Sequence, residues 1–413
     1  MKTILFFCYY FLTLLFFPIF LIFVIIHILF KPRYLRPYLQ RFSIVLPEKT
    51  PKTRKRVWLH AVSVGEVISC APLIRLFQEK GVSVYLSTTT PTGFCTAQKQ
   101  STGIQLLYFP IDYSFVISRL LNRIDPDAVL LCEMEIWPAF IDAVKKRRIP
   151  LYLISGRFGG TDFRNYHLLR FFFKHVLSLF DGLFMQSDLD TGRMKKLCNH
   201  KNIKALGSLK FDVTPDPVNH KVSTLLPDGS LLCAASTHRG DENFIVQAYK
   251  KLSEKYRDLK LLIVPRHAHR VGEITRILSK HGLDYTLRSN GTKCTTQVFL
   301  LDTVGELMGV FPKCHIVIMG GSFSKKIGGH NIIEPCLYKK CVLCGGHMEN
   351  FRDIFYMLKT ENAVVATNRE NLFDDLDTLL QNRGRAELIG ANAFRLIEKN
   401  RGASRRIYSE ISH

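Results

Sequence analysis

The segment from Thr3 to Phe30 contains no Asp, Glu, Lys or Arg, and this feature constrains the fold more than any other. About 20 consecutive apolar residues are enough for a helix to cross the hydrocarbon core of a bilayer. A cleaved signal peptide would have a shorter apolar region and a small-residue cleavage site, whereas this segment runs directly into Lys31 and Arg33. We therefore predict an uncleaved membrane anchor over residues 1–30, whose length favours crossing over partial embedding.

Basic residues crowd the sequence after this anchor. Residues 31–60 contain nine Lys or Arg and one acid, Glu48, whereas only Lys2 precedes the apolar segment. The positive-inside rule then places the rest of the chain in the cytoplasm. A net charge of +22 indicates an anionic partner, which could be acidic lipid, a phosphorylated substrate or nucleic acid. The 11 cysteines are odd in number and form no disulfide framework, as is typical of a reducing compartment.

After the anchor, short apolar runs alternate with helical patterns, which is the signature of parallel α/β sheets. The alternation stops at a Pro- and Asp-rich linker, Asp212–Asn219, and then starts again. Two consecutive units of this kind predict the GT-B fold, in which two Rossmann-like domains face each other across a cleft. We expect an acceptor domain over 31–213 and a donor domain over 220–395. Residues 396–413 form a C-terminal helix, with packing back on the first domain as one option.

Polar residues follow the predicted strands, where ligands of such sheets bind. Glu66 follows a strand and Gly65 at the start of a helix, so its carboxylate could act as a general base or could simply stabilise the helix N-terminus. The run from Ser87 to Gly93 could hold phosphate, although its hydroxyls are also ordinary helix caps. Glu133 and Glu135 share a strand face if the strand continues through them.

The second unit repeats this arrangement. Ser236 and Thr237 end a strand with hydroxyls suited to an anion. Arg266 ends the next strand, where it could hold phosphate or lie solvated on the surface. Gly320, Gly321, Gly328 and Gly329 let backbone amides approach a ligand closely, and Glu334 follows Asn331 at a distance that suits ribose hydroxyls.

Two further features carry less information. Cys336, Cys341, Cys344 and His347 resemble a zinc site, but Cys341 and Cys344 would face opposite sides of a strand and no second CxxC pair exists. We therefore expect no metal. The stretch His167–Phe180 mixes aromatic and basic residues, which suits either a membrane-interface helix or an ordinary domain helix with long cationic side chains.

Nine motifs in this order resemble those of the Kdo transferases, glycosyltransferase family 30, and the resemblance spans nearly the whole chain. They are WLHAVSVGEV, STTTPTG, FPIDYSF, EMEIWP, ASTHRGDE, PRHAHR, MGGSF, GGHNIIEP and GGHMENF. The resemblance implies transfer of Kdo from CMP-Kdo to a bisphosphorylated lipid A precursor at the inner membrane of a Gram-negative bacterium. It implies inversion at the sugar and neither a metal nor another cofactor.

The resemblance also assigns roles to residues. Glu66 would be the catalytic base, and Glu133, Glu135, Arg157 and Lys210 would contact the acceptor or the sugar. The CMP-binding set would be Ser236, Thr237, Arg266, Gly321, Asn331 and Glu334. The chain departs from the family pattern at two places on the acceptor side. Ser155-Gly-Arg157 stands where the family has Asn-Ala-Arg, and Gly207-Ser-Leu-Lys210 stands where it has Gly-Asn-x-Lys.

Two other functions remain open on these patterns. Another membrane-associated GT-B enzyme would use a UDP-sugar and a lipid acceptor. A membrane-tethered basic protein could bind nucleic acid, but no RRM, KH or aromatic-stacking motif occurs, and we expect no nucleic-acid partner.

Overall fold

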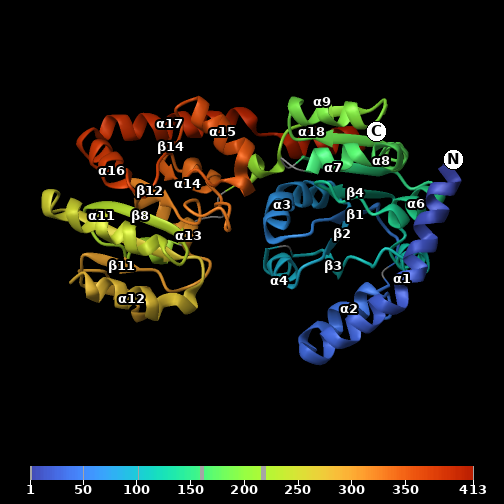
Figure 1. Cartoon of the computed structure of the whole chain (residues 1–413), viewed down its shortest axis with the longest axis horizontal. Helices are drawn as coiled ribbons and strands as arrows, with labels where there is room; N and C mark the ends of the chain where they lie inside the picture. Colours follow the sequence, from blue (N-terminus) through green and yellow to red (C-terminus); the bar gives the residue numbers. More distant parts are fainter. Residues whose placement is uncertain (1, 50, 101, 159–161, 215–219, 413) are drawn as a thin grey trace. The chain divides into compact units, whose positions relative to one another are not determined.

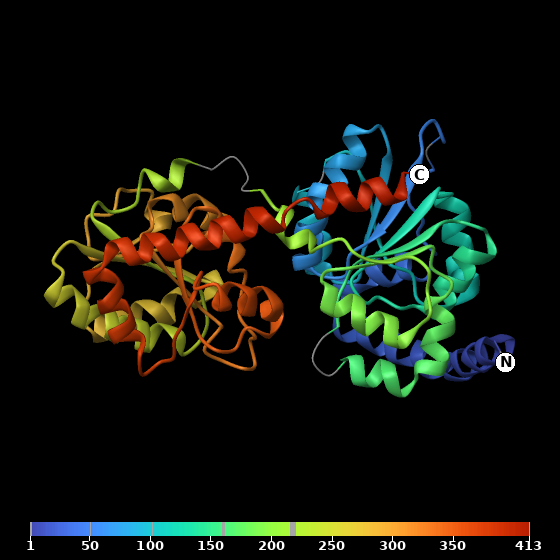
Figure 2. The ribbon, with the colours of Figure 1, turned by 90° about the horizontal axis from the view of Figure 1, so that it is seen from above.

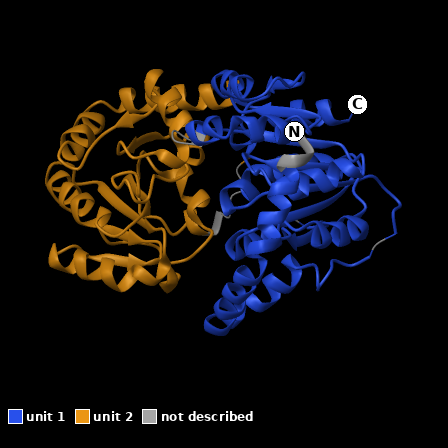
Figure 3. Ribbon diagram, turned by 45° about the vertical axis from the view of Figure 1, so that its right-hand side comes forward, with its two compact units in different colours: residues 1–213, 400–413 blue, residues 214–399 orange. Residues whose placement is uncertain are grey.

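The structure is a computed structural model that describes residues 2–49, 51–100, 102–158, 162–214 and 220–412. The chain divides into two compact units, shown in blue and orange in Figure 3. Unit 1 comprises residues 1–213 together with 400–413, and unit 2 comprises residues 214–399.

Unit 1 is built on a parallel sheet with the strand order β3-β2-β1-β4-β5-β6-β7 among the described residues. The strands are β1 (Arg56–His60), β2 (Ser83–Thr88), β3 (Gln105–Tyr108), β4 (Ala128–Cys132), β5 (Leu151–Gly156), β6 (Gly182–Met185) and β7 (Ile203–Ala205). The helices are α1 (Lys2–Phe30), α2 (Leu35–Arg41), α3 (Val64–Glu79), α4 (Pro91–Gln100), α5 (Ser114–Ile124), α6 (Pro138–Lys146), α7 (Asp162–Leu168), α8 (Arg170–Leu177), α9 (Asp188–Leu197) and α18 (Ala403–Ile411), with single turns η1 (Pro32–Tyr34) and η2 (Leu209–Asp212).

Alternate residues of the central strands enter two different cores, because successive side chains of a strand point to opposite faces. Trp58 and Val129 pack in one core with Phe140 of α6. Leu59 lies in the other core, on the face that α3 and α18 cover. All five residues of β1 and of β4 are buried, as expected for parallel strands with helices on both faces.

Unit 2 repeats the design with the order β10-β11-β9-β8-β12-β13-β14. Its strands are β8 (Ser230–Thr237), β9 (Leu259–Pro265), β10 (Tyr285–Leu287), β11 (Val298–Leu300), β12 (Ile316–Met319), β13 (Cys341–Cys344) and β14 (Val365–Ala366). Its helices are α10 (His220–Ser223), α11 (Asp241–Lys255), α12 (Val271–Lys280), α13 (Leu307–Val310), α14 (Ile333–Leu337), α15 (Arg352–Thr360), α16 (Leu372–Gln381) and α17 (Arg383–Asn400), with turns η3 (Ala268–Arg270), η4 (Arg288–Asn290), η5 (Phe311–Lys313) and η6 (Glu349–Phe351). Two Rossmann-like sheets are thus present, as predicted.

Helix α1 lies beside α6 of unit 1 (Figure 1). Residues 6–30 of this helix have a mean hydropathy of 2.9, and it is the one helix among the described residues that is long and apolar enough to cross a membrane. Its first turns are nevertheless fixed to the folded unit. The Tyr9 hydroxyl donates to Asp112 at 2.6 Å, and the Tyr10 hydroxyl donates to Asp142 of α6 at 2.5 Å.

The structure differs from the sequence-based expectation in three places. The stretch His167–Phe180 forms parts of two helices, α7 and α8, which meet at Leu169. Strands β7, β10 and β14 were not predicted, because they are short and lie at or near the sheet edges, where apolar runs are weak. The expected linker begins with Asp212, which is instead buried in η2, and residues 215–219 lie outside the described part of the chain.

The last helix, α18, belongs to unit 1 and packs against α3, as the view from above shows in red (Figure 2). Asp212 fixes its start, because the Asp212 carboxylate accepts from the backbone N–H groups of Gly402 and Ser404, each at 2.6 Å. Ala403 and Ile407 of α18 are fully buried in the core that contains Leu59.

We expect Asp212→Ala to lower the free energy of unfolding by about 1–2 kcal/mol, because two helix-terminal N–H groups lose their acceptor. Asp212→Asn, which keeps one acceptor oxygen, should lose less. Urea unfolding of the detergent-solubilised protein measures both. Equal stability of Asp212→Ala and the unchanged protein would show that the cap does not hold α18.

Candidate active site

Both sheets contain a topological switch point, where the chain leaves two neighbouring strands in opposite directions and opens a crevice at their carboxyl ends. In unit 1 these strands are β1 and β4, which pair directly. Glu66 lies in the first turn of α3, which follows β1, and Glu133 and Glu135 follow β4. The acidic residues singled out in the first half of the sequence therefore converge on one place.

Glu66 is held at the start of α3 by hydrogen bonds similar to those of a capping box. Ser63 is the N-cap residue, and its hydroxyl donates to Glu66 Oε1 at 2.8 Å. The backbone N–H of Val62 donates to Glu66 Oε2 at 2.9 Å. The carboxylate thus has the helix-capping role, and the same bonds fix it in one orientation at the strand end. The two readings of Glu66 are compatible.

Burial raises the pKa of Glu66 to about 7, and the nearby charges of Glu133 and Glu135 add to this effect. Glu133 has a left-handed backbone with φ of 59°, so the strand ends before it and the two glutamates do not share a strand face. Lys210 Nζ lies 3.3 Å from Glu133 Oε1 and partly neutralises the cluster. Glu135 accepts from the Trp137 indole N–H at 2.8 Å.

His60 is a site residue that sequence reasoning missed. Its ring stacks on Phe109 with centroids 3.8 Å apart, and its Nδ1 lies 3.0 Å from the carbonyl oxygen of Ser87. Complete burial lowers the pKa of His60 to about 3, so the ring is neutral. Nδ1 also lies 3.0 Å from the Ser87 hydroxyl, and Nε2 lies 3.9 Å from Glu135 Oε2. One feature of the sequence could have indicated His60, because it is a polar residue at the end of the otherwise apolar run Val57–Leu59.

Arg157 comes from a different strand end. It follows β5 directly and is half-buried, and it forms no ion pair with Glu66, Glu133 or Glu135 in the described part of the chain. Lys210, in contrast, comes from η2 and reaches Glu133. The structure therefore brings together the expected base, Glu66, and three of the four residues expected on the acceptor side, Glu133, Glu135 and Lys210.

The switch point of unit 2 lies between β8 and β12, which also pair directly. Ser236 forms a bulge in β8 with φ of 54°, and a Cβ on Gly320 would lie 2.6 Å from its carbonyl oxygen. Only glycine allows this approach of the two strand ends. The Asp241 carboxylate then ties the turns together, since it accepts from the N–H groups of His238 at 2.9 Å and Gly321 at 2.7 Å.

Histidines gather around the Gly321 turn. The Nε2 atoms of His238 and His330 lie 2.7 Å apart, in a hydrogen bond where one ring donates and the other accepts. The His267 ring packs edge-on against His238. Burial and the neighbouring cationic groups lower the pKa of His330 to about 4 and that of His238 below its usual value. Two neutral imidazoles therefore line this strand end, and the ring that accepts their shared hydrogen bond keeps an Nδ1–H that can donate to a ligand. The sequence alone assigned them no role.

Arg266 and Glu334 lie in the same cluster. Asn331 donates to Glu334 Oε1 at 3.0 Å at the start of α14. Burial raises the pKa of Glu334 to about 7, while Asn331 and the Arg266 charge oppose this rise. Arg266 is exposed, whereas Thr237 is fully buried and its hydroxyl has no partner within the described ranges. Ser236 and Arg266 are thus open to a ligand in this structure, and the Thr237 side chain is enclosed.

Across the described ranges, no group of His, Cys, Asp or Glu residues is arranged to hold a metal ion. Cys336, Cys341 and Cys344 are buried in unit 2. Burial raises the pKa of each of these three thiols. Such thiols are poor metal ligands, because a metal binds the thiolate.

Comparisons with known proteins agree on one family. A family model described as 3-deoxy-D-manno-octulosonic-acid transferase (Kdo transferase) matches residues 37–213. A 3-deoxy-D-manno-octulosonic acid transferase of Haemophilus influenzae is 31% identical over 391 residues, which cover 91% of each chain.

Solved structures support the fold of the chain. The UDP-GlcNAc 2-epimerase of Neisseria meningitidis has a TM-score of 0.59 and 14% identity, and the match covers 86% of this chain and 98% of that one. The MurG protein of Acinetobacter baumannii has a TM-score of 0.56 and 11% identity, with 87% and 99% covered. These neighbours share the predicted GT-B fold.

The raised pKa of Glu66 predicts how stability depends on pH. The Glu66 carboxyl keeps its proton up to about pH 7 in the folded protein but only up to about pH 4.5 in the unfolded chain. The stabilisation of the fold by protonated Glu66 is therefore complete below about pH 4.5 and is lost as pH rises through 7. Glu66→Gln removes this titration. We expect the stability of Glu66→Gln relative to the unchanged protein to increase between about pH 5 and pH 8. A pH-independent difference in urea unfolding would contradict the raised pKa.

Proposed function

The chain belongs to the Kdo transferase family, and from this premise we propose that it transfers Kdo from CMP-Kdo to the lipid A precursor lipid IVA, with inversion and without a metal. Kdo transfer in lipopolysaccharide biosynthesis follows from the family. The observation that carries the finer proposal is Glu66, a carboxylate fixed at the switch point of unit 1 whose pKa is raised to about 7.

Glu66 acts as the general base. At neutral pH a large share of this carboxylate is ionised, and its raised pKa makes it a stronger base than an ordinary glutamate. Glu66 takes the proton from a hydroxyl of the acceptor, and the hydroxyl oxygen forms a bond to the anomeric carbon of Kdo. The bond from that carbon to the CMP phosphate oxygen breaks, and CMP leaves with the electron pair. One displacement of this kind inverts the sugar carbon.

The second unit receives the developing negative charge of CMP. Arg266 is exposed next to neutral His238 and His330, so its guanidinium and the one N–H that the histidine pair leaves unused, on Nδ1 of the accepting ring, can contact the leaving phosphate. Donors that are already in place when charge develops on a leaving group lower the barrier. Glu334 and Asn331 supply the polar groups for the ribose, and the backbone at Ser236 and Gly321 lies at the same strand ends.

Glu133, Glu135 and Lys210 lie near Glu66, and we assign none of them the role of the base. Burial raises the pKa of Glu66, the negative charges of Glu133 and Glu135 add to this effect, and Lys210 contacts Glu133. We assign these three residues, with Arg157, to the acceptor side, where the sugar and the acceptor hydroxyl meet the base. Multiple Kdo additions would use the same groups.

Helix α1 holds the enzyme at the cytoplasmic face of the inner membrane, where the lipid acceptor and anionic lipids lie. Support comes from the basic residues that follow α1 in the sequence. It also comes from two exposed apolar side chains, Leu168 of α7 and Phe171 of α8. Phe172 of α8 stacks on Tyr9 of α1. Tyr9 and Tyr10 of α1 form hydrogen bonds with the folded part of unit 1. These contacts favour a helix that packs along unit 1 and is partly embedded in the membrane, rather than an isolated helix that crosses the bilayer.

We expect Glu66→Ala to lower the turnover number of Kdo transfer at least about a hundredfold, because the acceptor loses its base. CMP affinity, measured by calorimetry, should stay within about twofold, since Glu66 lies in unit 1 and the nucleotide residues in unit 2. Glu79→Ala, at the exposed far end of α3, is the matched control and should be fully active. Near-normal turnover by Glu66→Ala would exclude the base.

We expect Arg266→Ala to weaken CMP binding about tenfold and to leave cytidine binding unchanged, because only CMP carries the phosphate. Arg276→Ala, an exposed arginine of α12, is the control. Calorimetry with CMP, cytidine and UDP gives all three affinities. Equal losses for CMP and cytidine would reject a phosphate contact, and a preference for UDP over CMP would reject the donor.

A further inference from the structure

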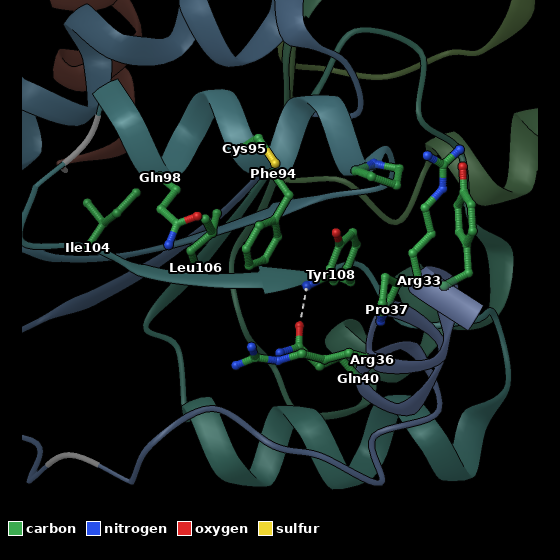
Figure 4. Close-up of a pocket in the computed structure, with 12 residues that line it drawn as sticks. Arg33, Arg36, Pro37, Gln40, Phe94, Cys95, Gln98, Ile104, Leu106 and Tyr108 are labelled. Atoms are coloured by element: carbon green, nitrogen blue, oxygen red, sulfur yellow. Dashed lines mark hydrogen bonds between the residues drawn. The ribbon is translucent and has the colours of Figure 1, made fainter. Parts of the chain in front are cut away.

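A cavity of about 550 Å³ lies in unit 1 between η1, α2, α4 and β3 (Figure 4). This volume is typical of sites that bind small molecules or parts of larger ones. None of the polar residues assigned to the reaction lines it. The lining residues are Arg33, Tyr34, Arg36, Pro37, Gln40, Pro91, Phe94, Cys95, Gln98, Ile104, Leu106 and Tyr108.

The wall formed by α4 and β3 is mainly apolar. Phe94 of α4 stacks on Tyr108 of β3 with ring centroids 4.5 Å apart and an interplanar angle of 10°. Ile104 and Leu106 extend this surface along β3. Gln40 of α2 is occupied, because its side-chain oxygen accepts from the Tyr108 N–H at 3.3 Å. The wall is therefore suited to an acyl chain or another apolar group.

The opposite side of the cavity is cationic. Arg33 and Arg36 are exposed and line it from η1 and α2, and no Asp or Glu is among the lining residues. Within the described ranges neither arginine forms an ion pair with an acid; Arg33 has a cation–π contact with Tyr34 at 5.4 Å. Two guanidinium groups without a carboxylate partner next to an apolar wall match an anionic amphiphile in charge and in polarity.

The cavity lies between the end of the apolar helix α1 and the segment that holds Glu66. Arg33 and Arg36 follow the end of α1 at Phe30 by less than two helical turns, so the proposed membrane anchoring through α1 brings them near the lipid headgroups. On the other side, Thr90, next to the first residue of α4, donates from its hydroxyl to the carbonyl oxygen of Val62 at 3.2 Å. Val62 is the residue whose N–H holds Glu66.

We propose that this cavity, the α2–α4 pocket, binds the lipid acceptor, with a phosphate at Arg33 and Arg36 and an acyl chain against Phe94 and Leu106. The proposal rests on the proposed function, because it takes the acceptor to be an acylated and phosphorylated lipid. An acyl chain that moves from the bilayer into an apolar pocket leaves one hydrocarbon environment for another and gains little. The arginine–phosphate contacts therefore provide the preference for this lipid.

Cys95 offers a direct measurement that needs no turnover. Among the described cysteines, Cys95 and Cys8 are exposed and the others are buried, and Cys95 lines the pocket. In a Cys8→Ser background, the full chain in phosphatidylcholine nanodiscs is treated with a small maleimide. We expect lipid IVA to slow the modification of Cys95 at least about fivefold, because the bound lipid covers the thiol.

Two comparisons identify the source of any protection. A dephosphorylated form of lipid IVA should protect Cys95 much less, and the double variant Arg33→Ala with Arg36→Ala should remove protection by lipid IVA. Phosphatidylglycerol at matched charge should not protect. Equal protection by phosphatidylglycerol would overturn the proposal in favour of a general anionic-lipid site, and absence of protection by lipid IVA would overturn it outright.

Kinetics provide the second readout. The double arginine variant should raise the KM for lipid IVA about tenfold while CMP affinity stays unchanged. Arg54→Ala with Lys55→Ala removes the same charge from exposed positions outside the pocket and should leave the KM unchanged. An equal rise of KM in both double variants would indicate general attraction to the membrane and overturn the pocket.

The pocket and the proposed function can fail separately. Protection of Cys95 by lipid IVA without Kdo transfer would refute the transfer reaction and retain the lipid site. Kdo transfer without protection would retain the reaction and refute the α2–α4 pocket.

Discussion

The structure depends on the way in which a parallel sheet forces its chain to leave neighbouring strands. Each connection must return across one face of the sheet to start the next parallel strand, and where two connections diverge, the carboxyl ends of two strands remain uncovered. In unit 1 this occurs at β1 and β4, and in unit 2 at β8 and β12. Backbone N–H groups and helix N-termini lie at both points. Polar side chains there can therefore be fixed by hydrogen bonds and still face a ligand.

The polar residues at these points are tuned by what surrounds them. Partial burial makes ionisation of Glu66 and Glu334 costly, which raises the pKa of each to about 7. Burial has the opposite sign for imidazoles, so it lowers the pKa of His60 and His330 and keeps both rings neutral. One physical cause thus produces weak acids that are half ionised near neutrality and histidines that donate hydrogen bonds without carrying charge.

The sequence predicted the central strands well, because strands that are buried on both faces read as continuous apolar runs. It also predicted Glu66, Glu133 and Glu135 as strand-end residues. Contacts between segments that are distant in the sequence could not be predicted from it. Nothing in the local pattern shows that His238 and His330 share a hydrogen bond, or that Tyr9 and Tyr10 tie the apolar helix to the folded unit. The left-handed backbone of Glu133, which ends its strand, was equally invisible, since only the packed sheet requires it.

The return of α18 to unit 1 has a consequence for synthesis. The core that contains Leu59 obtains Ala403 and Ile407 from a segment that follows unit 2 in the sequence, and the partners of Asp212 at Gly402 and Ser404 belong to the same segment. While a ribosome is still translating unit 2, the first sheet has an uncovered apolar strip beside α3. The core of the nascent first domain therefore remains incomplete until residues 403–411 have left the exit tunnel.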